Sequence, residues 1–266
     1  MAKIQFTKME GLGNDYIYVD ATRFRIENPA EVSRVLSDRH FGIGADGLVL
    51  IGRPDNADFS MRMFNADGSV GLMCGNASRC IGKYVYDKGL TDKTELTLDT
   101  LSGIKHLSLH LDADGTVGSV TVDMGAPVKV EPECTIEACG REFTGVFVDV
   151  GNPHLVIFTP DAEEVPLSLW GPAIEKLPAF PGGVNVEFFS PLAPGKFRMR
   201  VWERGSGITL ACGTGACATA AAAMALGLVS HKCTIVMDGG PLEIENAGTL
   251  LMTGPANTVF EGEIQI

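Results

Sequence analysis

The chain has 266 residues, of which 45% are hydrophobic and 20% are charged, as in globular proteins that bury apolar cores. Its formal net charge of −12 argues against nucleic acid or an anionic membrane as the main partner. The first residues lack the apolar core of a signal peptide, and no segment approaches the length of a membrane span. The seven cysteines include no Cys-x-x-Cys pair and fit a reducing compartment, so we expect a cytoplasmic protein.

The first half of the chain predicts short strands and two helices separated by glycine-rich turns. Alternating or continuous apolar residues predict strands over 4–9, 16–19, 48–51 and 59–64, and a hairpin over 94–111. A short helix is predicted over 29–39, with an apolar face made of Val32, Val35 and Leu36. A longer helix is predicted to follow Cys74 and to end at Gly89.

The second half predicts the same order of elements. Strands are predicted over 119–124, 143–150, 155–158, 184–189 and 197–202, and a helix over 167–176. The Ala-rich segment after Cys212 predicts a further helix, which Gly227 ends. A linker is expected over 111–118, and the last residues, about 256–266, are expected to return to the first domain.

A constant offset of 138 residues relates the two halves, as in 212 − 74 = 138 for two of the cysteines. The matched pairs are Phe59/Phe197, Met61/Met199, Arg62/Arg200, Cys74/Cys212, Gly75/Gly213, Gly89/Gly227 and Asn14/Asn152. We interpret this offset as an internal duplication. The expected fold is α+β: two pseudo-symmetric domains, each a curved mixed sheet around a central helix, with the active site in the interdomain cleft. The expected domains are 1–116, completed by a C-terminal strand at about 256–266, and 117–255.

The two matched cysteines each precede a helix in a glycine-rich setting. The positive potential at a helix N-terminus stabilises a thiolate, so a lowered thiol pKa is expected at both positions. Glycines there let backbone N–H groups face a carboxylate. One thiolate and one thiol suit a reaction that removes a proton from one face of a carbon and returns one to the other. The remaining cysteines are expected to be small buried apolar residues: Cys80, Cys134, Cys139, Cys217 and Cys233.

Several motifs resemble those of diaminopimelate epimerases over nearly the whole chain. These are Gly11–Tyr16 (GLGNDY), Asn65–Ser69 (NADGS), Met73–Asn76 (MCGN), Gly151–His154 (GNPH), Asn185–Phe188 (NVEF), Glu203–Gly205 (ERG) and Ala211–Gly215 (ACGTG). The resemblance implies that the enzyme interconverts LL- and meso-diaminopimelate, on the route to lysine and peptidoglycan. It implies no cofactor and no metal, a small-molecule amino-acid substrate, no nucleic-acid or membrane partner, and a homodimer.

The resemblance also implies roles for individual residues. The catalytic residues would be Cys74, Cys212, His154 and Glu203, with His154 and Glu203 poising the thiols. Backbone N–H groups of Gly75, Asn76, Gly213 and Thr214 would bind the reacting carboxylate. Other substrate contacts would come from Asn14, Asn65, Asn152, Asn185, Glu203 and Arg204. A bidentate pair with the distal carboxylate suits Arg204, and a substrate ammonium group suits Glu203.

Two departures from the family pattern leave the exact amino-acid substrate open. Ala77-Ser78 stands where the family usually has Gly-Ala, and Gly47 stands where some members carry glutamine. A racemase of another amino acid, such as histidine, is therefore an alternative, whereas the proline type usually shows Cys-Gly-His rather than Cys-Gly-Asn. A non-catalytic amino-acid-binding protein and a redox sensor with a Cys74–Cys212 disulfide are further alternatives. We find no Schiff-base lysine motif for pyridoxal phosphate and no compact zinc-ligand spacing.

Overall fold

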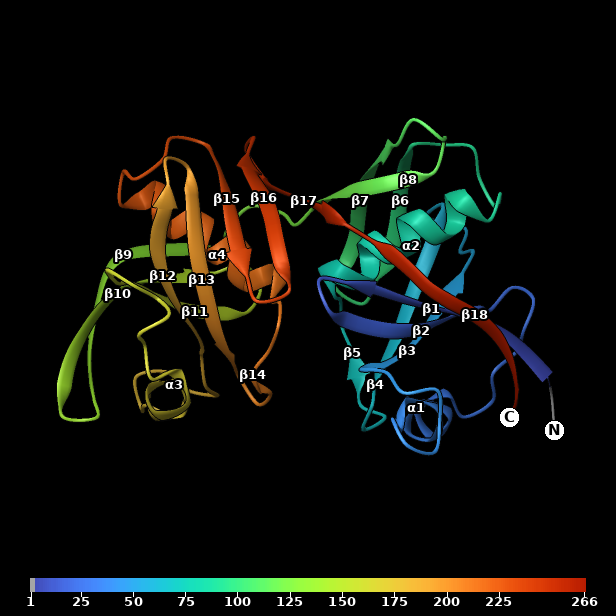
Figure 1. The fold of residues 1–266 in the computed structure, drawn as a ribbon, viewed down its shortest axis with the longest axis horizontal. Helices are drawn as coiled ribbons and strands as arrows, with labels where there is room; N and C mark the ends of the chain where they lie inside the picture. Colours follow the sequence, from blue (N-terminus) through green and yellow to red (C-terminus); the bar gives the residue numbers. More distant parts are fainter. Residues whose placement is uncertain (1–2) are drawn as a thin grey trace. The chain divides into compact units, whose positions relative to one another are not determined.

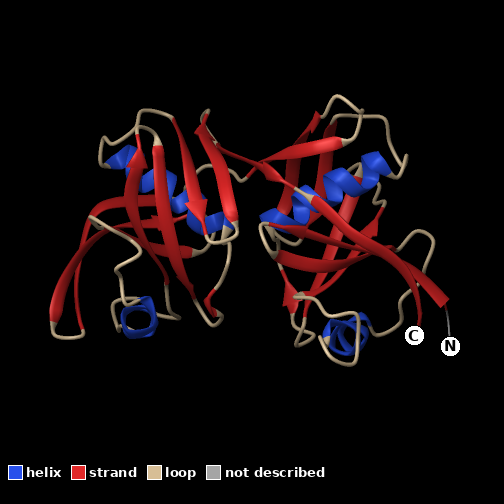
Figure 2. Ribbon diagram, in the orientation of Figure 1, coloured by secondary structure: helices blue, strands red, loops and turns tan. Residues whose placement is uncertain are grey.

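The computed structural model describes residues 3–266 and divides into two compact units (Figures 1 and 2). The first unit ends at Val122 and also takes in Gly254–Ile266, and the second unit is Asp123–Thr253. The domain ranges expected from the sequence, 1–116 with about 256–266 and 117–255, stay a prediction. Within the described residues, each unit has two helices among runs of consecutive strands, and the strands pair both in parallel and antiparallel, so the α+β class is confirmed.

The first unit contains the helices α1 and α2 and the strands from β1 to β8, together with β18. Their bounds are β1 Lys3–Gly11, β2 Asn14–Asp20, α1 Pro29–Ser37, β3 Gly47–Gly52, β4 Phe59–Asn65, β5 Val70–Gly71, α2 Gly75–Asp87, β6 Glu95–Thr100, β7 Gly103–Leu111, β8 Val117–Asp123 and β18 Asn257–Gln265.

The second unit contains the helices α3 and α4 and the strands from β9 to β17. Their bounds are β9 Lys129–Ala138, β10 Arg141–Asp149, β11 Pro153–Phe158, α3 Leu167–Glu175, β12 Asn185–Ala193, β13 Lys196–Glu203, β14 Gly207–Ile208, α4 Gly213–Ala225, β15 Lys232–Met237, β16 Gly240–Asn246 and β17 Leu250–Pro255.

The two units repeat one strand order, which confirms the duplication. In the first unit, neighbours pair in the order β18-β1-β2-β3-β4-β6-β7-β8, and in the second unit in the order β9-β10-β11-β12-β13-β15-β16-β17. In both orders the third strand pairs in parallel with the fourth. The register also repeats: Tyr16 lies opposite Gly47, and 138 residues later His154 lies opposite Asn185. Equivalent side chains of the two halves therefore occupy equivalent places in each unit.

A buried helix packs against the sheet of each unit. Helix α4 contacts β9 through β13 as well as β15 and β16, and its residues from Gly215 to Ala223 are all buried. A helix that is apolar on all sides is stable only when it is surrounded, which explains its run of alanines. Helix α2 contacts β1, β7 and β18, and Figure 1 shows it crossing strands of the first unit. Gly89 and Gly227, with φ of 67° and 71°, follow the two helices as predicted.

Several local expectations differ from the structure. The expected linker over 111–118 is instead the turn of a hairpin, because β7 and β8 pair antiparallel. Val35 is 57% exposed and does not belong to the buried face of α1, whereas Leu36, which was predicted for the same face, is buried. Cys139 is exposed rather than buried. Strand β9, which the apolar pattern did not predict, pairs with β10 in the same way that β18 pairs with β1.

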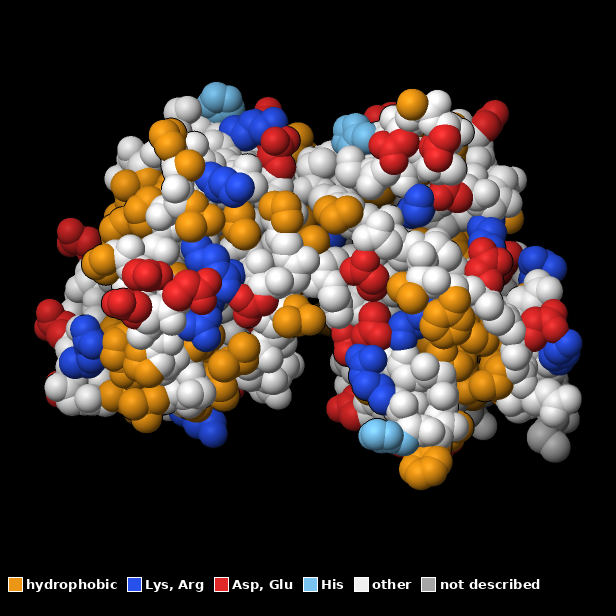
Figure 3. Space-filling model, viewed as in Figure 1, with side chains coloured by type: hydrophobic (Ala, Val, Ile, Leu, Met, Phe, Trp, Pro, Cys, Tyr) orange, Lys and Arg blue, Asp and Glu red, His pale blue; other side chains and the backbone are white. Residues whose placement is uncertain are grey.

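Among residues 3–266, no helix has both the length and the apolar character needed to cross a bilayer. Acidic and basic side chains are interspersed over the face drawn in Figure 3, with no continuous basic patch on that face.

Candidate active site

Cys74 is the N-cap of helix α2. Its backbone is extended, and its Sγ accepts a hydrogen bond from the backbone N–H of Ala77 at 3.5 Å. Gly75 and Asn76 are the first two helical residues, so their N–H groups belong to the helix end that has no intrahelical acceptor. The structure therefore places a half-buried thiol beside backbone donors, the arrangement that can hold an anion.

A chain of amide and carboxylate side chains continues from Cys74. In its protonated form the Cys74 thiol donates to Asn14 Oδ1 at 3.3 Å, and Asn76 Nδ2 donates to the same oxygen at 3.4 Å. Asn14 Nδ2 in turn donates to Asp46 Oδ2 at 2.8 Å. The buried Oδ1 of Asn76 has no hydrogen-bond partner among residues 3–266. Three predicted site residues of this unit, Cys74, Asn14 and Asn76, therefore form one network, which Asp46 anchors.

Asn65, the fourth predicted side chain of the first unit, lies at the end of β4, and its Nδ2 donates to Ser69 Oγ at 2.9 Å. It lies opposite Gly47 in the register of β3 and β4. A Cβ on Gly47 would lie 2.1 Å from the carbonyl oxygen of Phe64, so this backbone accepts no side chain there. The backbone of this chain therefore leaves no room at position 47 for the glutamine that some family members carry.

Cys212 repeats this arrangement as the N-cap of helix α4. Its Sγ accepts from the backbone N–H of Gly215 at 3.3 Å and lies 3.5 Å from Thr214 Oγ1. Asn152 Nδ2 donates to the same Thr214 oxygen at 3.3 Å. Gly213 and Thr214 begin the helix, as Gly75 and Asn76 do in α2. Both units therefore present a cysteine sulfur at the start of a buried helix.

The surroundings of Cys212 differ from the expected thiolate site. Burial raises the pKa of this thiol well above its ordinary value, and the nearby carboxylates of Glu203 and Glu187 raise it further. The expected lowering of its pKa by the helix N-terminus is therefore wrong. The thiol hydrogen-bonds to Glu203, whose own pKa is raised by burial and which also accepts from Thr209 Oγ1. Such a thiol holds its proton and can donate it.

His154 lies in β11, and the structure pairs it with Glu187 of β12. Its Nδ1 is 2.7 Å from Glu187 Oε1, and both side chains are fully buried. Within the described residues, the other ring nitrogen, Nε2, and the other carboxylate oxygen, Oε2, have no hydrogen-bond partner. A Cβ on Gly215 would lie 2.8 Å from Glu187 Oε1 and 3.2 Å from Cys212 Sγ. Glu187 and Cys212 are thus packed around the same glycine.

The last two predicted contacts, Asn185 and Arg204, lie next to each other. Asn185 Nδ2 donates to the Pro153 carbonyl at 2.9 Å, and its Oδ1 accepts from the backbone N–H of Arg204 at 2.9 Å. The Arg204 side chain is exposed, with one bond of 3.3 Å to the Gly182 carbonyl. Its guanidinium is therefore placed in solvent, where it can bind a carboxylate of a ligand.

Glu187 and Asp46 are residues of this region to which the sequence analysis assigned no role. Glu187 interrupts the apolar stretch Val184–Phe189, and a charged residue inside a buried strand needs a partner. Asp46 follows Gly44-Ala45 in a tight turn and binds Asn14, whose own role was predicted. Both signals were present in the sequence, but only the structure identifies the partner of each carboxylate.

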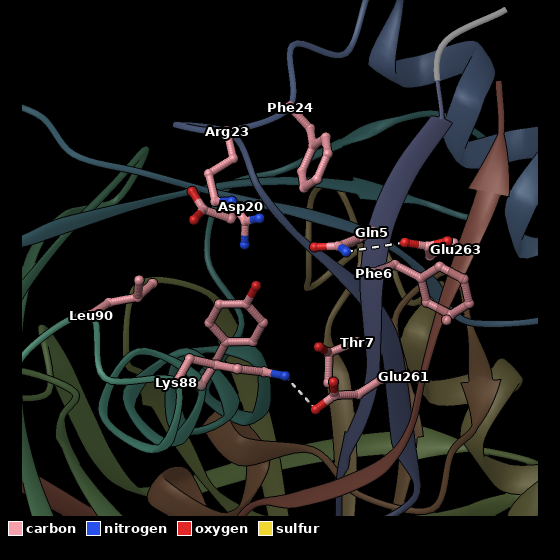
Figure 4. Close-up of a pocket in the computed structure, with 12 residues that line it drawn as sticks. Gln5, Phe6, Thr7, Asp20, Arg23, Phe24, Lys88, Leu90, Glu261 and Glu263 are labelled. Carbon is pink, nitrogen blue, oxygen red and sulfur yellow. Dashed lines mark hydrogen bonds and ion pairs between the residues drawn. The ribbon is translucent and has the colours of Figure 1, made fainter.

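A separate pocket of about 350 Å³ lies in the first unit between parts of β1, β2, α2 and β18 (Figure 4). In it Lys88 pairs with Glu261, and Gln5 donates to Glu263 at 3.1 Å. No predicted site residue lines it. The chemistry is therefore assigned to the surroundings of the two cysteines.

Comparisons with known proteins agree with this assignment. A sequence model of the diaminopimelate epimerase family matches residues 6–130 and 146–259. A diaminopimelate epimerase from Parabacteroides distasonis is 56% identical over 266 residues, covering 99% of this chain and 98% of that protein. Another, from Methanococcus maripaludis, is 51% identical over 278 residues, covering 99% of this chain and 100% of that protein.

Solved structures show the same fold at low identity. A phenazine biosynthesis protein of the PhzF family from Bacillus anthracis has a TM-score of 0.77 and 15% identity, with 100% of both chains covered. A hydroxyproline epimerase from Agrobacterium vitis has a TM-score of 0.69 and 17% identity, covering 98% of this chain and 92% of that one. The matching family model, the full-length relatives and the duplicated fold together establish that the chain belongs to the diaminopimelate epimerase family.

Proposed function

We propose that this chain epimerises LL-diaminopimelate to meso-diaminopimelate without a cofactor, in the cytoplasmic synthesis of lysine and peptidoglycan precursors. The observation that carries the proposal is the repeated placement of a cysteine sulfur as the N-cap of a buried helix, once in each half of a duplicated fold. Two acid/base groups of the same kind suit a reaction whose substrate and product differ only in the configuration at one carbon.

The two thiols have different roles in the first half of the reaction. The Cys74 thiolate removes the proton from Cα, and the Cys212 thiol gives its proton to the opposite face of the same carbon. The electron pair of the broken C–H bond passes into the α-carboxylate and returns to Cα when the new bond forms. Afterwards Cys74 carries the proton and Cys212 is the thiolate, the state that catalyses the reverse direction. The raised pKa of Cys212 supports its role as the donor.

Backbone N–H groups stabilise the charge that develops on the carboxylate. Gly75 and Asn76 supply them from α2, and Gly213 and Thr214 supply them from α4. In this mechanism both sulfurs act on the same substrate carbon. A dry site strengthens all of these interactions, so closure over the substrate belongs to this mechanism.

The remaining predicted residues bind the rest of the substrate. Arg204 pairs with the distal carboxylate through its exposed guanidinium, and Glu203 accepts a hydrogen bond from an ammonium group. The amides of Asn14, Asn65, Asn152 and Asn185 orient the polar ends, and His154 poises the Cys212 side of the site. A homodimer remains part of this proposal on the strength of the family resemblance.

Solvent-deuterium incorporation at Cα tests the function directly. LL-diaminopimelate and L-histidine are incubated separately with the protein in deuterium oxide, with no cofactor added, and are followed by mass spectrometry and NMR. We expect exchange and inversion with diaminopimelate only, and loss of both in Cys74→Ala and in Cys212→Ala. Cys139→Ala is the matched control, because this exposed cysteine belongs to neither network.

The outcomes separate the alternatives. Inversion of histidine but not of diaminopimelate keeps the two-thiol reaction and refutes the assigned substrate. Binding of either amino acid without exchange, unchanged by both cysteine substitutions, refutes the enzyme and identifies a binding protein.

A further inference from the structure

Arg79 is a charged side chain inside the first unit to which the proposed mechanism gives no role. It lies in helix α2, is 0% exposed, and its Nε donates to the Pro255 carbonyl at 3.0 Å. Within the described residues, its two terminal nitrogens have no hydrogen-bond partner. A guanidinium does not lose its proton in proteins, so a positive charge is buried here without a carboxylate bound to it.

The guanidinium lies toward the N-terminal turn of α2. A Cβ on Gly11 of β1 would lie 3.0 Å from Arg79 Nη2 and 3.3 Å from Asn76 Cβ, so the arginine head and Asn76 flank the same point of β1. Helical side chains point toward the helix N-terminus, which explains how a residue one turn further along reaches this place. Cys74 caps this turn, and a negative charge on Cys80 or on Cys74 would interact favourably with the guanidinium.

The other titratable groups near the guanidinium are Tyr18, Cys80 and Glu10. Burial raises the pKa of Tyr18 well above its ordinary value and that of Cys80 to about 12, so both stay neutral. The Glu10 carboxylate attracts the guanidinium but is not hydrogen-bonded to it, because its oxygens accept from the Gly13 backbone at 2.9 Å and from Asn257 at 2.6 Å. The thiolate of Cys74 is a second anion that can balance the guanidinium.

The duplicated half shows what changes when the arginine is absent. The residue 138 positions after Arg79 is Cys217, an uncharged buried side chain. Around Cys212 the charged groups are instead Glu203 and Glu187, and burial together with these two carboxylates holds that thiol in its protonated form. One sulfur therefore has a buried cation beside it and the other has two carboxylates.

We propose that Arg79 is a positioning residue whose buried charge stabilises the Cys74 thiolate and so makes Cys74 the base and Cys212 the acid in the resting protein. The assignment of base and acid rests on the proposed epimerase function. The effect of Arg79 on the Cys74 thiolate does not, because it concerns the free protein without substrate.

The test compares Arg79→Met, Arg79→Lys and Lys83→Met in the full chain. Met fills a similar volume without charge, Lys keeps the charge, and Lys83→Met removes a cation from the same helix, where Lys83 pairs with Asp87. The alkylation of Cys74 by iodoacetamide is measured from pH 5 to pH 10 by peptide mass spectrometry. At pH 7 we expect Arg79→Met to react at least about tenfold more slowly, because raising the pKa of a thiol by about one lowers its thiolate population about tenfold. The lysine variant and the control are expected to keep fast alkylation.

A second readout separates this effect from damage to the fold. Replacing an uncompensated buried charge by an apolar side chain is neutral or stabilising, so the melting temperature of Arg79→Met is expected to stay or rise. An unchanged alkylation profile in folded Arg79→Met overturns the proposal. The unmodified protein alone gives a second test: if the alkylation rate of its Cys74 has a pH midpoint of about 8.5, as for an ordinary thiol, the proposal is also overturned. Failure of deuterium exchange refutes the epimerase function and leaves this test intact.

Discussion

Replacing Glu187 by glutamine tests the electrostatic account of the Cys212 half of the site. The substitution removes one negative charge and keeps the shape and an oxygen that can accept from His154 Nδ1, now 2.7 Å away. Since both side chains of the pair are fully buried, the change acts on the site without altering the surface. Glu187, unlike Glu203, is not proposed to touch the substrate, so the substitution leaves substrate binding in place.

The magnitude follows from the packing around Gly215. A Cβ there would lie 2.8 Å from Glu187 Oε1 and 3.2 Å from Cys212 Sγ, so the oxygen and the sulfur are separated by no more than about 6 Å. At an effective dielectric constant of about 20, a charge at that distance is worth roughly 3 kcal/mol, or about two pH units. The amide dipole of glutamine and rearrangement of the site reduce this, and we expect the pKa of Cys212 to fall by about one to two pH units.

The assay is the pH dependence of kcat/KM in the direction in which Cys212 donates the proton. Activity in this direction is lost as the pH rises through the pKa of Cys212, because only the thiol form can donate. The alkaline decline is therefore expected at lower pH in Glu187→Gln than in the unmodified protein. The control is Glu243→Gln, which removes an exposed carboxylate that pairs with Lys232 in the same unit.

The free energy of unfolding gives an independent check. Glutamine replaces a charged hydrogen bond to His154 by a neutral one, so we expect a loss of about 1 kcal/mol in urea unfolding. Glu187→Ala, which leaves the buried histidine without an acceptor, is expected to cost about 3–5 kcal/mol. An alkaline limb that stays in place in a folded Glu187→Gln protein refutes the reasoning, whatever the stability.

Two further predictions concern packing and alkaline stability. Gly215→Ala places a methyl group against Glu187 and the Cys212 sulfur, and the resulting strain of roughly 1–3 kcal/mol is expected to lower kcat at least about tenfold. The control is Ala77→Gly, at the equivalent position of α2, which is expected to keep most of the activity. Equal losses of kcat in the two variants, measured in steady-state assays, contradict this prediction. Burial raises the pKa of Cys80 from its ordinary 9.0 to about 12, so its contribution to stability is complete below 9.0 and is lost as the pH rises toward 12. Urea unfolding at several pH values in this window gives the free energy of unfolding as a function of pH. Its decline with rising pH is expected to be less steep by about 1.4 kcal/mol per pH unit in Cys80→Ala than in the unmodified protein, and unchanged in Cys139→Ala.

The helices and the duplication could be predicted because their signals are local or periodic. Cys74 and Cys212 each precede a run of helix formers that a glycine ends, and the structure has N-caps at both cysteines. The offset of 138 residues places Pro29–Ser37 onto Leu167–Glu175 and Gly75–Asp87 onto Gly213–Ala225. A polar and charged strand such as Lys129–Ala138 carries little apolar alternation, so its conformation is decided by its pairing with β10 and not by the sequence pattern.

The composition of the site was partly predictable, but its electrostatics was not. Sequence spacing and resemblance predicted the two thiols and the amides as site residues, and the structure joins Asn14 and Asn76 to Cys74 in one network. The expected pKa of Cys212 rested on the positive potential of the helix N-terminus, which predicted a lowered pKa. Burial and Glu187, which is 25 positions earlier in the sequence (212 − 187), act in the opposite direction and dominate. Burial and long-range neighbours of this kind are set by the fold.

The duplication therefore explains both the likeness and the difference of the two thiols. A shared backbone gives each cysteine a helix N-terminus and a set of backbone donors, but a symmetric pair would have no preference for which sulfur carries the proton. The halves differ in charge at several equivalent positions, among them Arg79 against Cys217, Val49 against Glu187, and Asn65 against Glu203. Each difference favours an anion at Cys74 or a proton near Cys212. Removing one of these differences, as Arg79→Met does, should therefore make the pKa values of the two thiols more alike while the protein stays folded.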